Sequence, residues 1–197
     1  MDIEFKKETD QLDMITNVYM DTEFLEDGNT IDLISIGLVF DDTEYYAVSN
    51  SFNFDKVWAD DWVRTNVLLP IAGEYLDLSN SDKEAIRRCI NRIGKPNEEI
   101  KEDILRLLSH IPVDFYTYYG AYDWVVFCRL FGKMIDLPKN FPMFSIDLKQ
   151  IMVYEHLTKE WKRLNCPDPV GEHNALIDAK WNRRLHDKIK GCTGNIF

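Results

Sequence analysis

The sequence is short of cysteine and of positive charge, and both shortages exclude classes of function. Its four cysteines are widely separated and include no Cys-x-x-Cys pair: Cys89, Cys128, Cys166 and Cys192. A zinc site built from thiolates is therefore not expected. Lysine and arginine total 23 against 34 aspartates and glutamates, for a formal net charge of -11. This balance disfavours non-specific binding along a phosphate backbone, although an enzyme that engages a few nucleotides through metal ions stays compatible with it.

Long apolar stretches are also missing. No run is long enough to span a membrane, and residues 1–7 include no apolar stretch typical of a signal peptide. We therefore expect no membrane association and a cytoplasmic protein whose cysteines are free thiols. With 197 residues, 45% hydrophobic content and no repeat or low-complexity linker, the chain suits one core. The prediction is a single domain over residues 1–197, with 1–16 peripheral and 191–197 a tail.

The patterns of strand and helix alternate along the chain, which is typical of an α/β domain. Three strands joined by short turns, which form an antiparallel meander, are predicted at 18–24, 31–40 and 44–49. Residues 52–72 show no sustained period and are expected to form short helical turns and loop. Further along, strands are predicted at 113–120 and 143–147, and helices at 81–92, 97–110 (capped by Asn97), 121–131, 148–158 and 174–190.

Asp21 and Glu23 are the unusual feature of the first strand. Because a strand repeats every two residues, both carboxylates project from one face, while Met20, Thr22 and Phe24 project from the other. Burying two like charges costs several kcal/mol unless a counter-charge lies between them, and a divalent cation would supply it. An Asp-x-Glu triplet alone is expected about once by chance in so acidic a chain. The interpretation therefore depends on acids elsewhere.

Asp123 lies where the strand at 113–120 ends and the next helix begins. Phe127 and Leu130 follow on the same helix face, so this acid leads an apolar stripe and is predicted to point toward the core. A first-turn Asp that complements the helix dipole is the simpler interpretation of the residue in isolation. Such an acid normally faces solvent, which favours the site interpretation here.

The last helix carries a fourth acid, Asp178. It shares a narrow face with small residues that would let the helix approach the sheet closely: Ala175, Ala179 and Asn182. His173 precedes the expected Asn174 cap and lies five residues before Asp178. A single histidine is more often structural or solvated, but this one stands where a general base for water would be needed.

These residues resemble a known family in their order along the chain. Asp21-Thr22-Glu23, the Asp123 segment and His173 followed by Asp178 are similar to the three motifs of the DEDDh 3′-to-5′ exonucleases, the superfamily of ribonuclease T and the proofreading subunits. Closer similarity is to the small bacterial and phage exoribonucleases typified by a mycobacterial RNase, through segments 21–28, 62–65, 120–123 and 173–180. The resemblance covers most of residues 18–188. It implies an RNase H-like fold, with a five-stranded mixed sheet of order 3-2-1-4-5 whose strand 2 is antiparallel, and a homodimer.

The resemblance also implies an activity and a set of site residues. The activity is hydrolysis of single-stranded RNA from its 3′ end, with release of nucleoside monophosphates, by two divalent cations, Mg²⁺ or Mn²⁺. Asp21 would bridge both ions, Glu23 and Asp178 would complete the first, and Asp123 would act mainly through water on the second. His173 would take the proton from the attacking water. Candidates for contacting the substrate are Phe24, Arg64 and Tyr122, although Phe24 is equally well interpreted as a core residue.

Other functions stay open at this level. A DNA exonuclease of the same superfamily would carry the same motif residues. Outside the enzymes, a charge of -11 suits an acidic protein that mimics nucleic acid and binds a basic partner. An inactive family member could also serve as a binding subunit. The complete set of four acids and one histidine argues against both of these non-catalytic alternatives.

Overall fold

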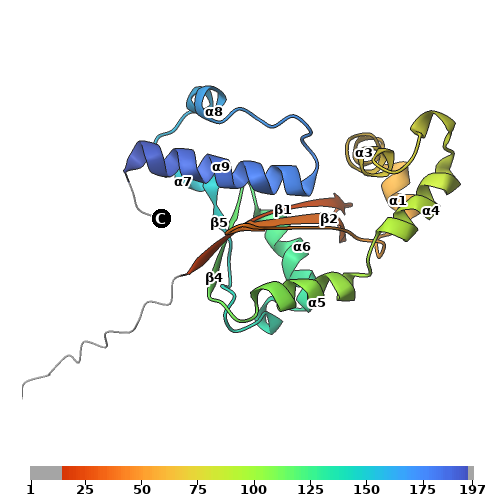
Figure 1. The fold of residues 1–197 in the computed structure, drawn as a ribbon, viewed down its shortest axis with the longest axis horizontal. Coiled ribbons are helices and arrows are strands. Elements are labelled where there is room, and N and C mark those ends of the chain that lie inside the picture. The colour runs from red at the N-terminus through yellow and green to blue at the C-terminus, as the bar shows by residue number, and fades with distance from the viewer. Residues whose placement is uncertain (1–14, 195–197) are drawn as a thin grey trace, which may run out of the picture.

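The computed structural model of the protein describes residues 15–194, which form one mixed sheet covered by helices on both faces (Figure 1). The strands are β1 (Thr16–Glu26), β2 (Ile31–Phe40), β3 (Thr43–Val48), β4 (Val113–Thr117) and β5 (Ile146–Asp147). The sheet order is β3-β2-β1-β4-β5, and β2 is antiparallel to both of its neighbours. β4 is parallel to β1 and to β5. The predicted RNase H-like sheet, with order 3-2-1-4-5, is confirmed.

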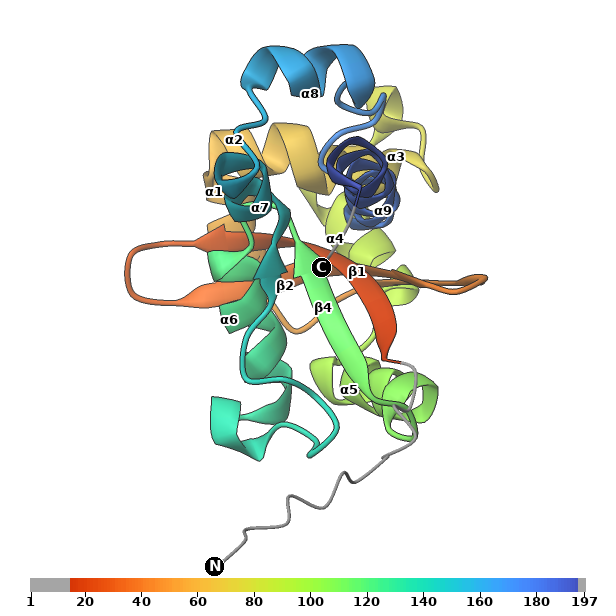
Figure 2. The ribbon, with the colours of Figure 1, turned by 90° about the vertical axis from the view of Figure 1, so that its left-hand side faces the viewer.

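The helices form two layers and one lateral group, as the two ribbon views show (Figures 1 and 2). Above the sheet lie α7 (Leu148–Tyr154), α8 (Lys159–Asn165) and α9 (Ala175–Thr193), and below it lie α5 (Asn97–Leu108) and α6 (Ala121–Phe131). At one end of the sheet are α1 (Phe54–Ala59), α2 (Asp61–Val63), a π-helical turn (Arg64–Leu68), α3 (Leu69–Gly73) and α4 (Lys83–Ile93).

β1 is covered on both faces, and its residues alternate between the two layers. Val18 and Met20 belong to the core shared with α5 and α6, whereas Tyr19 packs in the core that includes α9. Because alternate residues of a strand share a face, Asp21 lies on the α9 side and Thr22 on the α6 side. This alternation decides which layer can supply a partner to each residue of the first motif.

The start of α9 lies very close to β2, because the residues that face each other are small. Ala175 and Ala179 of α9 are fully buried. A Cβ atom added to Gly37 of β2 would lie 2.2 Å from the carbonyl oxygen of Ala175. Farther along α9, the buried Asn182 side chain donates to the carbonyl oxygen of Met20, at 2.9 Å. The predicted close approach of the last helix to the sheet is thus present, and glycine in β2 makes it possible.

Replacement of Gly37 by Ala is expected to destabilise the protein, because the new methyl group meets the backbone of α9 rather than a flexible side chain. Overpacking of this kind costs about 1–3 kcal/mol or more, so thermal unfolding should shift down by several degrees. Gly191→Ala is the control: Gly191 lies inside α9 with nothing within 4 Å of an added Cβ. That variant should gain about 0.5–1 kcal/mol. Equal melting temperatures for the two variants would contradict the prediction.

Several element boundaries differ from the sequence prediction. Asn97 does not cap α5: Pro96 is the N-cap residue, and the Asn97 side chain instead accepts a hydrogen bond from the Ser49 hydroxyl at 2.7 Å. The strand predicted at 113–120 ends at Thr117, before Tyr119 adopts a left-handed φ of 57°. The strand predicted at 143–147 contains only Ile146–Asp147. Local patterns located these elements but not their ends.

α8 is a helix that the sequence analysis did not predict. The predicted helix at 148–158 ends at Tyr154, and a new helix starts after Thr158, whose hydroxyl accepts from the Trp161 backbone N–H at 3.1 Å. A Thr cap followed by charged residues is a helix signal, so α8 could have been predicted from the sequence. Residues 52–72, expected to be helical turns and loop, are mostly helical.

The expected peripheral ends lie largely outside the described residues, which exclude 1–14 and 195–197. Thr16 already belongs to β1, and α9 continues to Thr193, so residues 191–193 are helix rather than tail. Gly194 ends α9 with a left-handed φ of 74°. Within residues 15–194, no helix has both the length and the apolar content required to cross a bilayer.

Candidate active site

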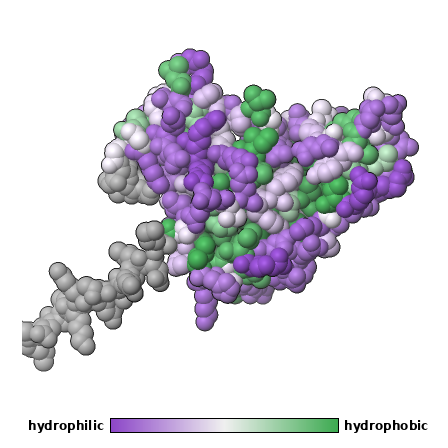
Figure 3. All heavy atoms as spheres, in the orientation of Figure 1, coloured by the Kyte–Doolittle hydropathy of each residue, from purple (hydrophilic) through white to green (hydrophobic). Residues whose placement is uncertain are grey.

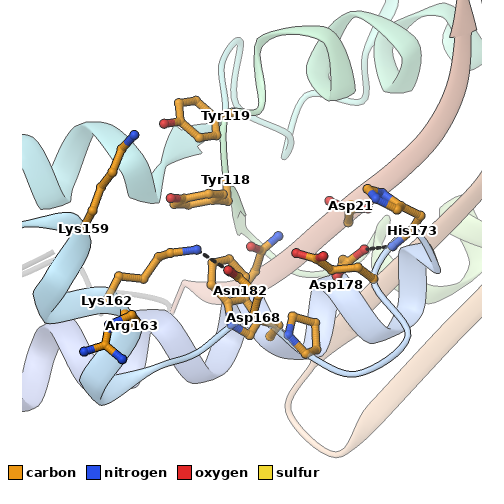
Figure 4. A pocket seen from close by; sticks show the side chains of 13 residues that line it. Asp21, Tyr118, Tyr119, Lys159, Lys162, Arg163, Asp168, His173, Asp178 and Asn182 are labelled. Carbon is orange, nitrogen blue, oxygen red and sulfur yellow. Dashed lines mark hydrogen bonds and ion pairs between the residues drawn. The ribbon is translucent and has the colours of Figure 1, made fainter. Parts of the chain in front are cut away.

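Three carboxylates meet on the α9 side of β1. Asp21 and Glu23 come from the strand and Asp178 from the first turn of α9, and each places one carboxylate oxygen within 4.8 Å of the others. No lysine or arginine in the described part of the chain forms an ion pair with any of them. Asp21 and Asp178 lie with His173 at one end of an open cavity (Figure 4). We refer to Asp21, Glu23 and Asp178 as the carboxylate group.

Asp123 approaches β1 from the opposite layer. Its carboxylate oxygen Oδ1 accepts hydrogen bonds from the backbone N–H of Thr22, at 2.9 Å, and from the Thr22 hydroxyl, at 2.7 Å. Its charge is close enough to raise the pKa of Asp21 by repulsion. It is not part of the carboxylate group, whose three oxygens lie within 4.8 Å of one another. The structure therefore brings three of the four predicted acids into one group and places Asp123 next to it, bound to Thr22 and close enough to raise the pKa of Asp21 more than Glu23 or Asp178 does.

The acids of this site are held in their protonated form to unusually high pH. Burial and then the charges of Asp178 and Asp123 raise the pKa of Glu23 to about 8. Burial also raises the pKa of Asp178 to about 6, opposed by the hydrogen bond from the His173 backbone, and that of Asp123 to about 6, opposed by its bonds from Thr22. The pKa of Asp21 lies well above its usual range, because the carboxyl is buried and because neighbouring carboxylates repel its charge.

The carboxylate group fits a divalent cation on its chemistry. Its donors are all oxygens, as Mg²⁺ and Mn²⁺ prefer, and charge repulsion adds to burial in raising the pKa of Asp21 and of Glu23. A cation bound among these oxygens would remove that repulsion and displace the protons.

In the absence of metal, the protein is expected to lose stability as pH rises. A carboxyl whose pKa is raised in the folded state holds its proton longer there than in the unfolded chain, so its contribution is present below about pH 4 and lost as pH rises through the folded value. For Glu23 that value is about 8. Melting temperatures in EDTA should therefore fall between pH 5 and pH 8, and Glu23→Gln should reduce the fall by raising the value at pH 8.

The matched control for this experiment is Asp42→Asn, which removes one exposed negative charge in the turn between β2 and β3. It should leave the pH dependence of the wild type unchanged, which separates the local repulsion from the overall charge of -11. The raised pKa of Glu23 would be contradicted by a wild-type melting temperature that does not change with pH. It would also be contradicted if the melting temperature of Glu23→Gln fell with pH as steeply as that of the wild type.

His173 is held in an uncommon backbone conformation at the rim of the site. Its φ is 67°, in the left-handed region, and its backbone N–H donates to Oδ2 of Asp178 at 2.8 Å. The next residue, Asn174, caps α9 by accepting from the N–H groups of Leu176 and Ile177. The imidazole lines the cavity beside Asp21 and Asp178 (Figure 4), which is the location that a base for water requires.

Trp62 contacts His173, although the sequence motifs predicted no role for this residue. The two ring centroids lie 4.8 Å apart at an interplanar angle of 75°, and Trp62 is 54% exposed. It begins the segment at 62–65 that carries part of the family resemblance, so a signal was present. The residue comes from α2, more than a hundred positions before His173 in the chain, and no local pattern predicts this contact.

The three candidate substrate contacts lie outside the cavity. Phe24 is half-buried against the core below the sheet, with its ring 6.0 Å from that of the exposed Tyr122. Arg64 donates to the carbonyl oxygen of Trp58 and to Asp61, each at 2.6 Å. None of the three lines the cavity, so their role in substrate binding stays a prediction.

The cavity extends well beyond the predicted acids. It has a volume of about 520 Å³. In addition to Asp21, Asp178 and His173, it is lined by the aromatic residues Tyr118, Tyr119 and Trp181, by Asn182 and Pro169, by the basic residues Lys159, Lys162 and Arg163 of α8, and by Asp168 and Glu172. The basic side chains lie at the end of the cavity away from Asp21 and Asp178, and Lys162 is paired with Asp168 (Figure 4).

Comparison with known proteins identifies the family of the chain. Residues 16–190 match the model of a family described as the 3′-5′ exoribonuclease Rv2179c-like domain. This chain belongs to that family. Two Mycobacterium tuberculosis relatives, the 3′-5′ exoribonuclease Rv2179c of strain H37Rv and the 3′-5′ exoribonuclease MT2234.1 of strain CDC 1551, are each 36% identical to it over 167 residues. The alignment covers 82% of this chain and 86% of each relative.

A solved structure of exonuclease I has the same fold as this member of the Rv2179c-like family. The two superpose with a TM-score of 0.57 at 12% sequence identity, over 90% of this chain and 41% of exonuclease I. This chain thus spans less than half of the length of exonuclease I, and the similarity concerns the fold alone. The predictions of a 3′-5′ exonuclease enzyme and of membership in the family of the mycobacterial exoribonucleases are confirmed.

Thr22 is the second residue that the sequence analysis left without a role. In this member of the Rv2179c-like family its hydroxyl helps to hold the Asp123 carboxylate ionised. Thr22→Val should cost about 1 kcal/mol of stability. On the prediction that Asp123 is a metal ligand, it should also lower nuclease activity about 10- to 100-fold, because Thr22 orients that carboxylate. Thr22→Ser, which retains the hydroxyl, should keep most of the activity. Equal rates for the Val and Ser variants in a single-turnover assay would exclude this role.

Proposed function

We propose that this chain is a metal-dependent 3′-to-5′ exoribonuclease that removes nucleoside monophosphates from the 3′ end of single-stranded RNA. The observation that supports this most directly is the carboxylate group, which lies beside His173 in a chain of a 3′-5′ exoribonuclease family. The raised pKa of Glu23 favours a cation site over a set of solvated surface acids.

In this proposal, Asp21, Glu23 and Asp178 hold one divalent cation, and Asp21 with Asp123 holds a second. When bound, two such ions activate a water and neutralise the leaving oxygen. Mg²⁺ and Mn²⁺ suit the oxygen donors. Thr22 keeps Asp123 oriented through two hydrogen bonds, and the His173 backbone does the same for Asp178.

His173 is proposed to act as the general base. Its imidazole lines the cavity next to the carboxylate group, so it can accept the proton of the water that attacks the phosphorus. The bond from phosphorus to O3′ of the preceding nucleotide breaks, which releases the terminal nucleotide with its 5′ phosphate and leaves a new 3′ hydroxyl. The ring of Trp62 contacts the imidazole edge-on.

The proposal is tested with purified protein on end-labelled single-stranded RNA and DNA in Mg²⁺, Mn²⁺ or EDTA. We expect mononucleotides from RNA with either metal and no product in EDTA. Full activity in EDTA would overturn the proposal. A circular single strand cut as fast as a linear one would indicate an endonuclease instead. Faster hydrolysis of DNA than of RNA would favour the alternative, a DNA exonuclease of the same superfamily.

Two further parts of the proposal concern the state of the protein. A homodimer is implied by the resemblance to the exoribonuclease family and is tested by light scattering after size-exclusion chromatography. A cytoplasmic location is consistent with the four free cysteines, of which Cys89, Cys128 and Cys166 are buried and Cys192 is exposed. The non-catalytic alternative, an acidic protein that binds a basic partner, receives no support from the family.

A further inference from the structure

We propose that α8 and the end of β4 form a binding site for the second nucleotide from the RNA 3′ end, in which Lys159 binds the phosphate and Tyr119 stacks on the base. This inference rests on the proposed function. It concerns the end of the cavity that lies opposite the carboxylate group, where no predicted site residue is found (Figure 4).

The two ends of the cavity differ in charge. At one end are the acids that the proposed metal site requires, and at the other end Lys159, Lys162 and Arg163 project from one helix (Figure 4). In a chain of net charge -11, this wall of the acidic site is where basic side chains gather. Hydrophilic side chains also cover most of the surface over α8 and α9 on the face drawn in Figure 3. This end is therefore suited to an anionic, hydrated ligand rather than to an apolar one.

The three cations differ in how far they are available. Lys162 is ion-paired with Asp168 and lies 4.9 Å from the ring centroid of Trp181, so it is fixed in the wall. Arg163 pairs with Glu160 within α8, at 2.6 Å. Lys159 is exposed, and no carboxylate of residues 15–194 pairs with it. Lys159 is therefore the cation best placed to receive a phosphate.

The number of phosphates in the substrate decides which one this can be. The 3′-terminal nucleotide has one phosphodiester, and this is the bond cleaved at the carboxylate group. A second anion site that lies apart from that group therefore binds a phosphate on the 5′ side of the scissile one, and the nearest of these is the phosphate of the second nucleotide. Asp168, which is ion-paired with Lys162, and Glu172 also line the cavity, and each disfavours a phosphate beside it. Lys159 of α8 therefore remains the favoured position for a phosphate.

Tyr119 supplies an aromatic surface in the same cavity as these cations, and a fourth cation, Lys149, lies over its ring at 6.0 Å from the centroid. It is 61% exposed, yet its position is held: its backbone has a φ of 57° and its N–H donates to Asp147 at 3.2 Å. Its ring lies edge-on to that of Tyr118, with centroids 4.8 Å apart. An exposed, supported aromatic ring next to cations is the usual arrangement for stacking a base of single-stranded RNA.

The test compares two substrates with the same two 3′-terminal nucleotides: a dinucleotide without a 5′ phosphate, and a single strand of about 20 nucleotides. With Lys159→Ala, kcat/KM on the long strand should fall about tenfold, mainly through KM, and should be unchanged on the dinucleotide. The slope of log kcat/KM against log salt should become shallower by about 0.7, the value of one phosphate contact on a single strand. Lys159→Arg should restore both quantities.

Tyr119→Ala tests the base contact and should lower kcat/KM about tenfold on both substrates, because the dinucleotide also carries the second base. Tyr119→Phe should be close to wild type. The control is Lys139→Ala, which removes an exposed lysine next to Asn140; that asparagine binds the end of α5 on the opposite face of the sheet. Lys139→Ala should match the wild type on both substrates.

The outcomes separate this inference from the proposed function. A wild-type protein that degrades neither substrate would overturn the proposed function and this inference with it. The phosphate site alone would be overturned if the wild type degraded both substrates and Lys159→Ala lowered the two rates equally, or lowered neither rate. Wild-type activity of Tyr119→Ala would overturn the base contact alone.

Discussion

Asp21→Asn is expected to abolish hydrolysis while leaving the fold intact. Asp21 is the acid that the other three carboxylates all affect, and it lies at the end of the cavity with Asp178 and His173. Removing its charge takes away a donor shared by both proposed cations. Because each 1.4 kcal/mol of lost transition-state stabilisation is tenfold in rate, and metal ions supply several kcal/mol, we expect a loss on the order of 10³-fold or more. The measurement is the single-turnover rate on end-labelled RNA at saturating Mg²⁺.

The same variant should be at least as stable as the wild type in EDTA. The pKa of Asp21 is raised by burial and by Asp123, Glu23 and Asp178 in that order, so replacement of the carboxylate by a neutral amide relieves repulsion. Asp178→Asn should behave in the same way. Asp42→Asn, which alters an exposed carboxylate in the β2–β3 turn, should keep the wild-type rate. Substantial activity in Asp21→Asn would exclude the carboxylate group as the metal site, and a lower melting temperature in EDTA would contradict the repulsion.

Removal of the His173 imidazole is expected to lower the rate about 10²- to 10⁴-fold, the range for a lost general base. The structure favours Asn over Ala for this test, because the φ of 67° at His173 is a conformation that Asn tolerates better than most residues. His173→Asn should therefore preserve the N–H bond to Asp178 while removing the base. His173→Ala should show the same loss of rate with an added loss of stability.

The pH profile separates a base from a structural residue. Histidine side chains change charge near neutral pH, so the wild-type rate should rise through the neutral range and then level off. His173→Asn should flatten this rise. The measurement uses saturating metal, because the carboxyl pKa values of about 6 to 8 would otherwise contribute a rise of their own through metal binding. Metal affinity should change little. A well-folded variant with the wild-type rate and profile would show that His173 only shapes the start of α9.

The sequence by itself determined the parts of this protein that local patterns encode. The two-residue repeat of β1 predicted that Asp21 and Glu23 share a face, and the small residues of the last helix predicted its close approach to the sheet. Helical spacing located α6 at the same residues as the structure, Ala121–Phe131. The sheet order came from the family resemblance, since no periodicity specifies which strands are neighbours.

The tertiary structure alone decided how these parts meet. Asp178 joins Asp21 and Glu23 because α9 covers the same face of β1, whereas Asp123 arrives from the α6 face and binds Thr22. The contact of Trp62 with His173, and the position of α8 across the cavity from the acids, likewise join distant segments. Such contacts depend on strand register and on the way each helix crosses the sheet. Register and crossing geometry are set by packing between residues far apart in the chain, so a local sequence pattern does not predict them.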